Sequence, residues 1–143
     1  MHAPILAAED EETDALLLKI AFKEAGLPNA LVLARDGQEA VDYLSGRPPY
    51  ADRSLHPLPG LLLLDLKMPR MTGFEVLEWL ATRPDLKDLP VVVLSSSADQ
   101  LDIARALRTG ARDCREKPHD YRQLTHLLQE VCARWLPGGD GRA

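Results

Sequence analysis

The feature that most constrains the fold of this chain is a repeated alternation of short apolar runs with segments of helical periodicity. Apolar runs of strand length, the last of them more polar, occur at 5–8, 30–34, 61–66, 90–94 and 111–116. After each of them, apolar residues recur every three or four positions. This alternation predicts an α/β fold in which parallel strands are joined by right-handed helical crossovers and helices cover both faces of one sheet.

The expected helices have ordinary start and stop signals. They are predicted over 11–25, 37–45, 73–81, 98–109 and 120–136. Asp36 is a possible cap of the second helix, and Gly46 follows its end. Between that helix and the third strand, residues 47–60 contain four of the eleven prolines and predict a loop.

The first and third helices each predict an apolar face. The inner side of the first helix is expected to carry Leu16, Leu17, Ile20, Ala21 and Ala25. The inner side of the third helix is expected to carry Phe74, Leu77 and Leu80.

Composition excludes several classes of protein. The 143 residues suffice for one domain, and 45% of them are hydrophobic, which argues against disorder. The net charge of −5 gives no electrostatic reason to bind nucleic acid. We see no signal peptide and no membrane span, so a cytoplasmic protein is expected. Neither the cysteines (Cys114, Cys132) nor the histidines (His2, His56, His119, His126) have metal-site spacing.

Polar residues whose side chains could take part in binding or catalysis stand where the predicted strands end. Glu9 and Asp10 follow the first strand, Asp65 ends the third, residues 95–97 are serines after the fourth, and Lys117 follows the fifth. In an open parallel sheet the binding site lies at the carboxyl ends of the strands. The sequence therefore predicts a site made of three carboxylates, hydroxyl groups and one ammonium group.

That set of groups suits phosphoryl transfer. Carboxylates held close together repel one another unless a hard cation such as Mg²⁺ lies between them. A strand-end aspartate such as Asp65 can attack phosphorus and form an acyl phosphate. The transferred oxygens then need positive charge from the metal and Lys117, and the Ser95 hydroxyl can donate to one of them.

Four segments together resemble the signature of bacterial response-regulator receiver domains. They are 5–10, the Asp-x-x-Met-Pro-x-x-x-Gly stretch in 61–73, 91–95, and Lys117-Pro118. The resemblance extends over residues 4–136. It implies a flavodoxin-like, doubly wound, five-stranded parallel sheet in the order 2-1-3-4-5 with five helices. The loop with Arg47-Pro48-Pro49-Tyr50 and the Trp135-Leu136 ending resemble a narrower group, the small stand-alone receivers associated with bacterial phytochromes.

The resemblance also implies a role for each position. Asp65 is the expected phosphoryl acceptor. The expected ligands of Mg²⁺, for which Mn²⁺ or Ca²⁺ can substitute, are Glu9, Asp10, Asp65 and the backbone carbonyl of Lys67. The residues expected to bind the phosphoryl group are Ser95 and Lys117. The residues expected to form turns are Pro69, Gly73 and Pro118.

Two positions depart from the family pattern. Cys114 stands three residues before the lysine, where the family often has a Tyr or Phe that swings inward on activation. Lys67, two residues after Asp65, occupies a position that tunes dephosphorylation, and we expect its long cationic side chain to reach the acidic pocket. Ser97 is a second expected tuning residue and a possible helix cap.

The expected partners are a sensor histidine kinase, possibly of phytochrome type, and a downstream protein or phosphotransfer partner. A homodimer through the fourth helix, fifth strand and fifth helix is a further hypothesis. We expect a receiver over 1–136, a flexible tail over 137–143, and no output domain.

Other functions remain open. The favoured function is a phospho-accepting signalling domain, which we do not expect to be a dedicated enzyme. The main alternative is a binding module that works without phosphate. A phosphatase of the haloacid-dehalogenase type would need a second aspartate where Lys67 stands. A flavin mononucleotide binder would need a Ser/Thr/Gly-rich loop where the acidic run 9–14 stands.

Overall fold

The computed structural model describes residues 2–96 and 99–136, which form a five-stranded parallel sheet in the order β2-β1-β3-β4-β5. The strands are β1 (Ile5–Ala8), β2 (Leu31–Ala34), β3 (Leu61–Leu64), β4 (Val91–Ser95) and β5 (Asp113–Glu116). The α-helices in this part of the chain are α1 (Glu12–Glu24), α2 (Gly37–Ser45), α3 (Gly73–Ala81), α4 (Gln100–Thr109) and α5 (Tyr121–Trp135). The predicted strand order and helix count are confirmed.

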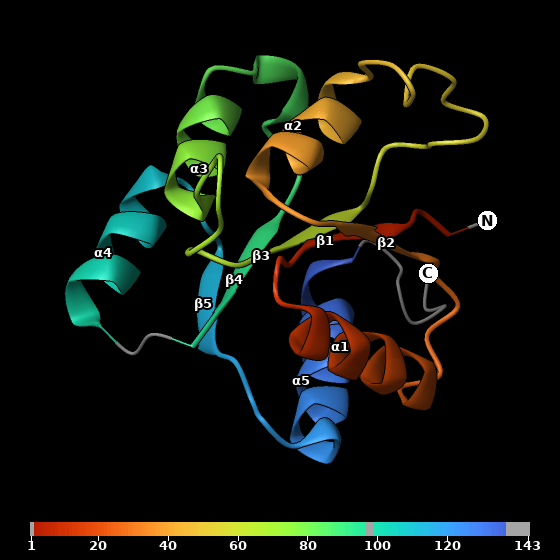
Figure 1. Cartoon of the computed structure of the whole chain (residues 1–143), viewed down its shortest axis with the longest axis vertical. Coiled ribbons are helices and arrows are strands. Elements are labelled where there is room, and N and C mark those ends of the chain that lie inside the picture. Colours follow the sequence, from red (N-terminus) through yellow and green to blue (C-terminus); the bar gives the residue numbers. More distant parts are fainter. Residues whose placement is uncertain (1, 97–98, 137–143) are drawn as a thin grey trace.

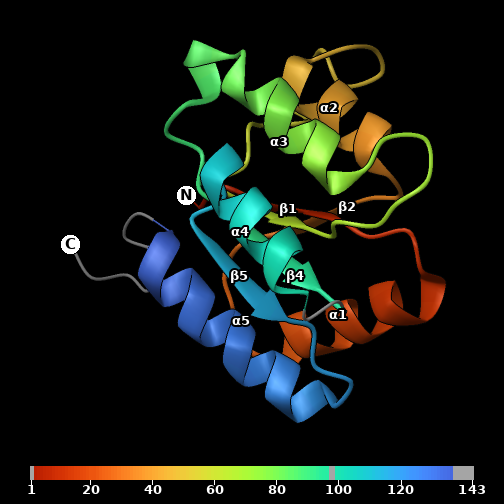
Figure 2. The same ribbon diagram turned by 90° about the vertical axis from the view of Figure 1, so that its left-hand side faces the viewer.

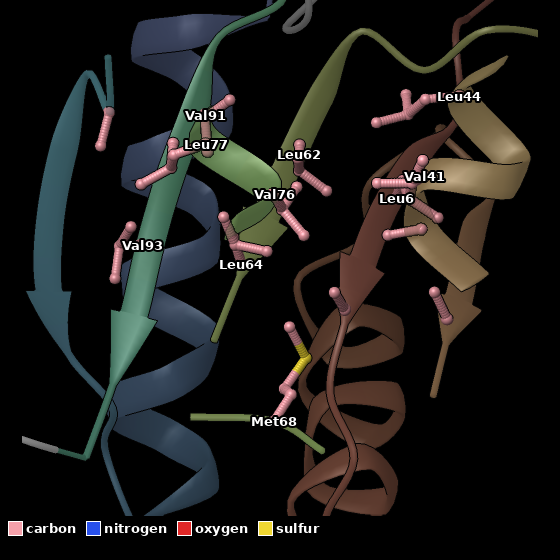
Figure 3. Close-up of a cluster of buried hydrophobic side chains, with 14 of the residues drawn as sticks. Leu6, Val41, Leu44, Leu62, Leu64, Met68, Val76, Leu77, Val91 and Val93 are labelled. Atoms are coloured by element: carbon pink, nitrogen blue, oxygen red, sulfur yellow. The ribbon is translucent and has the colours of Figure 1, made fainter. Parts of the chain in front are cut away.

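The helices cover both faces of the sheet. α1 and α5 lie on one face, and α2, α3 and α4 lie on the other (Figures 1 and 2). Successive strand side chains point to opposite faces, so Leu62 and Leu64 pack toward α2 and α3, while Leu61 and Leu63 pack toward α1 and α5. Figure 3 shows the hydrophobic core between the sheet and α2 and α3, which includes Leu62 and Leu64. β3 is buried on both faces, as its four leucines predicted.

The predicted capping signals act as expected. The Asp36 carboxylate accepts a hydrogen bond from the Glu39 backbone N–H at 2.8 Å, and α2 ends at Gly46 with a φ of 75°. Thr72 and Glu75 form a capping box at the start of α3, which was not predicted. Several element boundaries shift by one or two residues, and Ser95 is the last residue of β4 rather than the first one after it.

The predicted inner face of the first helix is partly wrong. Leu16 and Ile20 are exposed, with relative accessibilities of 58% and 44%, and the buried face consists of Leu18, Ala21 and Phe22. α1 packs along α5 and the edge of the sheet, so only this narrow stripe is covered. The exposed Leu16 and Ile20 fit the helical period equally well, and only the tertiary contacts distinguish the two faces.

The inner face of α3 also differs from the expectation. Val76 and Leu77 are its fully buried apolar residues, whereas Phe74 and Leu80 are half-buried. Phe74 packs partly against the core and partly under the guanidinium of Arg105, whose central carbon lies 4.1 Å from the ring centroid. The face of α3 is therefore turned slightly from the one that its sequence suggests.

The proline-rich segment 47–60 contains no helix or strand, as predicted, and side chains fasten it to the end of α2. The Tyr43 hydroxyl donates to the Pro57 carbonyl at 2.8 Å. The Arg53 guanidinium donates to the carbonyls of Tyr43 and Leu44 at 2.9 Å each. A cation at the C-terminal carbonyls of a helix is favourable, so this loop is an ordered part of the domain.

The expected tail at 137–143 lies outside the described residues. Within the described part of the chain, every helix is too short or too polar to cross a membrane.

Candidate functional site

The register of the sheet brings the predicted site residues to one edge. Ala8 of β1 pairs with Leu64 of β3, so Glu9 and Asp65 leave their strands at the same level. The Ser95 residue that ends β4 pairs with Glu116 of β5, directly before Lys117. The polar residues at the ends of these strands therefore lie side by side, as the sequence predicted.

The carboxylates of Glu9, Asp10 and Asp65 form a compact group. One oxygen from each lies within 4.8 Å of the others. Glu9 and Asp65 are each only 8% exposed, while Asp10 faces solvent. Oxygen ligands at this density, open to water on one side, fit a hard divalent cation that keeps part of its hydration shell. The donor set is therefore chemically suited to Mg²⁺ or Mn²⁺.

The Lys117 ammonium balances this charge from the other side. Its Nζ lies 2.6 Å from Glu9 Oε1, 3.1 Å from Asp14 Oδ2 and 3.5 Å from Asp65 Oδ2. Burial alone would lower the pKa of Lys117, but the hydrogen bond with Glu9 and the charges of Asp65 and Glu9 outweigh it and raise the pKa. Lys117 is therefore firmly cationic.

Burial dominates the electrostatics of both buried carboxylates. Desolvation raises the pKa of Asp65 above its ordinary value, although the Lys117 charge and a hydrogen bond from the Lys67 backbone N–H act against it. Desolvation likewise raises the pKa of Glu9, opposed by its hydrogen bond with Lys117. Both groups are held in a site where an additional cation would favour their charged forms.

The loop between β3 and α3 is built closely around Asp65. The Lys67 backbone N–H donates to Asp65 Oδ1 at 3.3 Å, and the Gly73 N–H donates to the Leu66 carbonyl at 3.0 Å. Arg70, at a φ of 63°, is the one non-glycine residue with a positive φ in the described chain. Its guanidinium donates to Asp36 Oδ2, with Nη2 at 2.6 Å and Nε at 2.8 Å. This pair fastens the loop to the start of α2.

The remaining predicted residues take varied positions. Ser95 is buried at the same edge of the sheet, 4% exposed. Cys114 is half-buried against α4, with Sγ 4.0 Å from the Ile103 carbonyl oxygen, and desolvation raises the pKa of its thiol. Lys67 is exposed, and its ammonium forms no ion pair within 4.0 Å in the described part of the chain. Ser97 lies outside the described residues.

The predicted turn residues lie beside the site. Pro69 is in the loop that contains Arg70, Gly73 begins α3, and Pro118 directly follows Lys117.

Sequence reasoning missed two interactions at this edge. The contact of Asp14 with Lys117 was not predicted, although Asp14 belongs to the acidic run and lies four residues after Asp10. The pair of Arg70 with Asp36 was also not predicted, because only the capping role of Asp36 is visible in the local sequence.

Comparisons with known proteins show the family to which this chain belongs. The chain matches the Response regulator receiver domain family over residues 5–129. Response regulator Rcp1 of Synechocystis is 32% identical over 132 residues, which cover 92% of this chain and 88% of Rcp1. The structure of the phosphorylated cyanobacterial phytochrome response regulator RcpA is similar with a TM-score of 0.85 and 33% identity, over 94% of both chains.

A third similar protein is the response regulator RPA3017 in red light signalling of R. palustris. It has a TM-score of 0.88 and 31% identity, over 94% of this chain and 98% of that one. The family match covers most of the chain, and both similar structures align with 94% of it. The chain therefore belongs to the response-regulator receiver domain family, where it is similar to the small phytochrome response regulators.

Proposed function

We propose that this protein accepts a phosphoryl group on Asp65 from a phosphohistidine of a sensor kinase and signals through protein contacts that depend on this modification. The observation that carries the proposal is the position of Asp65. Its carboxylate belongs to the group suited to a metal, and it lies 3.5 Å from the Lys117 ammonium. A nucleophile, a cation site and a fixed positive charge thus meet at one edge of the sheet.

In the proposed reaction an Asp65 carboxylate oxygen attacks the phosphorus atom. The new O–P bond forms as the P–N bond to the donor imidazole breaks, and the imidazole leaves with the bond electrons and takes up a proton. Lys117 neutralises charge that develops on the transferred group, and Ser95 donates a hydroxyl hydrogen bond to it. Water later cleaves the acyl phosphate and regenerates the Asp65 carboxylate.

Mg²⁺ is the proposed cofactor, with Mn²⁺ or Ca²⁺ as substitutes. The residues that would hold it are Glu9, Asp10, Asp65 and the backbone carbonyl of Lys67. Bound there, it supplies positive charge for the transferred oxygens. The support is the group of three carboxylates described above.

Cys114 and Lys67 are the proposed sites of unusual regulation. Because Cys114 has no ring to swing inward, we propose that Ser95 and Cys114 transmit phosphorylation to α4 through the contact with Ile103. We propose Lys67 and Ser97 as residues that tune the acyl phosphate lifetime. The exposed Lys67 ammonium is free to approach a group carried by Asp65. Unchanged Mg²⁺ affinity together with an unchanged acyl phosphate half-life in Lys67→Asn would refute the tuning role of Lys67.

The proposed partners are a sensor histidine kinase and a downstream or phosphotransfer protein. A phytochrome-type kinase is favoured because RcpA is a phytochrome response regulator and RPA3017 acts in red light signalling. Because the net charge of −5 does not attract nucleic acid and no described helix could cross a membrane, we propose no nucleic-acid or membrane partner. We also propose a cytoplasmic location. A homodimer through α4, β5 and α5 is also proposed, because Leu101 and Tyr121 there are 80% and 42% exposed. Sedimentation that shows only monomer, with and without a phosphoryl mimic, would refute the dimer.

The first experiment is intact mass spectrometry after incubation with Mg²⁺ and acetyl phosphate. We expect a single phosphoryl adduct on the wild type, no adduct on Asp65→Asn, and no adduct in the presence of EDTA. An unmodified wild type that remains folded and binds Mg²⁺ would contradict the proposal. That result would favour the alternative function, a phosphate-independent binding module.

A further inference from the structure

The Lys117 ammonium has a carboxylate partner that lies outside the group suited to a metal. That group consists of Glu9, Asp10 and Asp65, and Asp14 is not part of it. Asp14 nevertheless approaches the Lys117 Nζ to 3.1 Å, closer than Asp65 does at 3.5 Å. The two residues are 103 positions apart in the sequence, so the fold itself brings them together.

The first turn of α1 fixes Asp14 in this position. The Glu11 side chain caps the helix and accepts a hydrogen bond from the Asp14 backbone N–H at 3.0 Å. The Asp14 side chain is only 28% exposed, and that of Lys117 is 8% exposed. An ion pair in such a setting is screened less by water and salt than a pair on the open surface.

Among the described residues, two of the three carboxylates that contact Lys117 are also candidate metal ligands. Glu9 and Asp65 both belong to the group suited to a metal and both contact the ammonium. Their oxygens cannot serve Lys117 and a divalent cation equally well. Asp14 is free of this conflict, since its carboxylate serves Lys117 alone among the described side chains.

We propose that Asp14 is a positioning residue, which holds the Lys117 ammonium to one side of Asp65 and sets how Lys117 is shared between the metal ligands and the phosphoryl group. This inference rests on the proposed function and deepens it. With Asp14 present, Glu9 and Asp65 are less occupied by the ammonium and more available to Mg²⁺. A phosphoryl group on Asp65 must then draw Lys117 away from Asp14.

The proposal gives two effects of opposite sign when Asp14 is replaced. In Asp14→Asn the ammonium relies on Glu9 and Asp65, so Mg²⁺ binds more weakly. The phosphoryl mimic BeF₃⁻, measured at saturating Mg²⁺, no longer competes with the Asp14 charge and binds more tightly. For one partly buried charged hydrogen bond we expect each change to be about threefold to tenfold.

Loss of any negative charge near the site would also shift both affinities in these directions, so two controls are needed. Glu12→Gln removes one charge from the same turn of α1, at an exposed residue without an ion pair among the described residues. Lys117→Met removes the proposed intermediary. The Mg²⁺ affinities of Asp14→Asn, Lys117→Met and the double variant complete a double-mutant cycle.

Isothermal titration of the purified full chain measures these affinities. The proposal predicts that Glu12→Gln shifts the Mg²⁺ affinity by less than about twofold. It also predicts that Asp14→Asn has no larger effect than that in the Lys117→Met background. An equal effect of Asp14→Asn and Glu12→Gln would overturn the proposal, as would an undiminished effect without Lys117. Weaker binding of both Mg²⁺ and BeF₃⁻ would show a merely structural role and also overturn it.

A wild type that binds neither probe would overturn the proposed function, and this inference with it. Wild-type binding of both probes with no specific effect of Asp14→Asn would overturn the inference alone.

Discussion

Gly73 begins α3 directly behind the proposed phosphoryl acceptor, and its replacement by alanine tests how closely that loop is built. A Cβ atom at this position would lie 2.3 Å from the Asp65 carbonyl oxygen and 2.7 Å from the Leu66 Cα. Both are backbone atoms, which cannot rotate away as a side chain can. An ordinary van der Waals contact requires the backbone around Asp65 to retreat by about 1 Å.

The energetic cost follows from two opposing effects. Alanine favours a helix over glycine by up to about 1 kcal/mol. Overpacking a dense region costs about 1–3 kcal/mol, and the upper end applies because backbone must move. The expected net loss is therefore about 2 kcal/mol of unfolding free energy. For a domain of this size it lowers the Tm by roughly 6 °C.

Urea and thermal denaturation followed by circular dichroism measure this loss, and titration with Mg²⁺ measures the damage to the site. We expect weaker Mg²⁺ binding in Gly73→Ala, because the carboxylate of Asp65 moves with its backbone. Gly26→Ala is the matched control: the Cβ would meet nothing within 4 Å, and only the φ of 68° is unfavourable. It should cost about 1 kcal/mol and leave Mg²⁺ binding intact. A Gly73→Ala variant with wild-type stability and Mg²⁺ affinity would refute the reasoning.

Three further predictions concern stability and reactivity. Asp36→Ala loses a helix cap and the Arg70 pair and should cost about 2 kcal/mol in urea denaturation, against at most about 0.5 kcal/mol for Asp42→Ala at the surface pair with Arg47. Ellman's reagent should modify Cys114 slowly and Cys132 only after unfolding, because burial raises the pKa of the Cys132 thiol to about 12. Because burial raises the pKa of Asp65, its ionised form opposes folding, and wild-type stability falls as pH rises from the ordinary pKa to the raised one. Metal-free Asp65→Asn should therefore be more stable than wild type at neutral pH, by a margin that shrinks as the pH falls below the raised pKa and vanishes below the ordinary one.

The α/β class and the edge of the sheet were predictable because both depend on short-range patterns, whereas the strand order came from the family resemblance. A short run such as Leu61–Leu64, apolar at every position, favours a central strand that is buried on both faces, and Asp65 is the first residue beyond it. The polar residues that follow each strand must then meet, since parallel strands end on the same side. No knowledge of long-range contacts is needed for that step.

The errors and omissions all involve partners far apart in the sequence. The face of α1 depends on how the helix lies against α5, so Leu16 and Ile20 could not be separated from Leu18 by periodicity alone. Likewise, the partner of Asp14 is 103 residues away and that of Asp36 is 34 residues away. Local sequence indicates which side chains are charged, whereas the packing of helices on the sheet decides which charges meet.

The excess of negative charge at the edge of the sheet determines whether the metal ion or the phosphoryl donor must bind first. Among the described residues, the carboxylates of Glu9, Asp14 and Asp65 contact the Lys117 ammonium, and Asp10 lies beside Glu9 and Asp65. An incoming phosphoryl donor is itself an anion, so it meets net negative charge unless a divalent cation is already bound. Occupation of the metal site should therefore precede phosphoryl transfer. A phosphorylation rate that stays unchanged when Mg²⁺ is removed would show instead that the protein's own cationic side chains, Lys117 among them, can neutralise the donor.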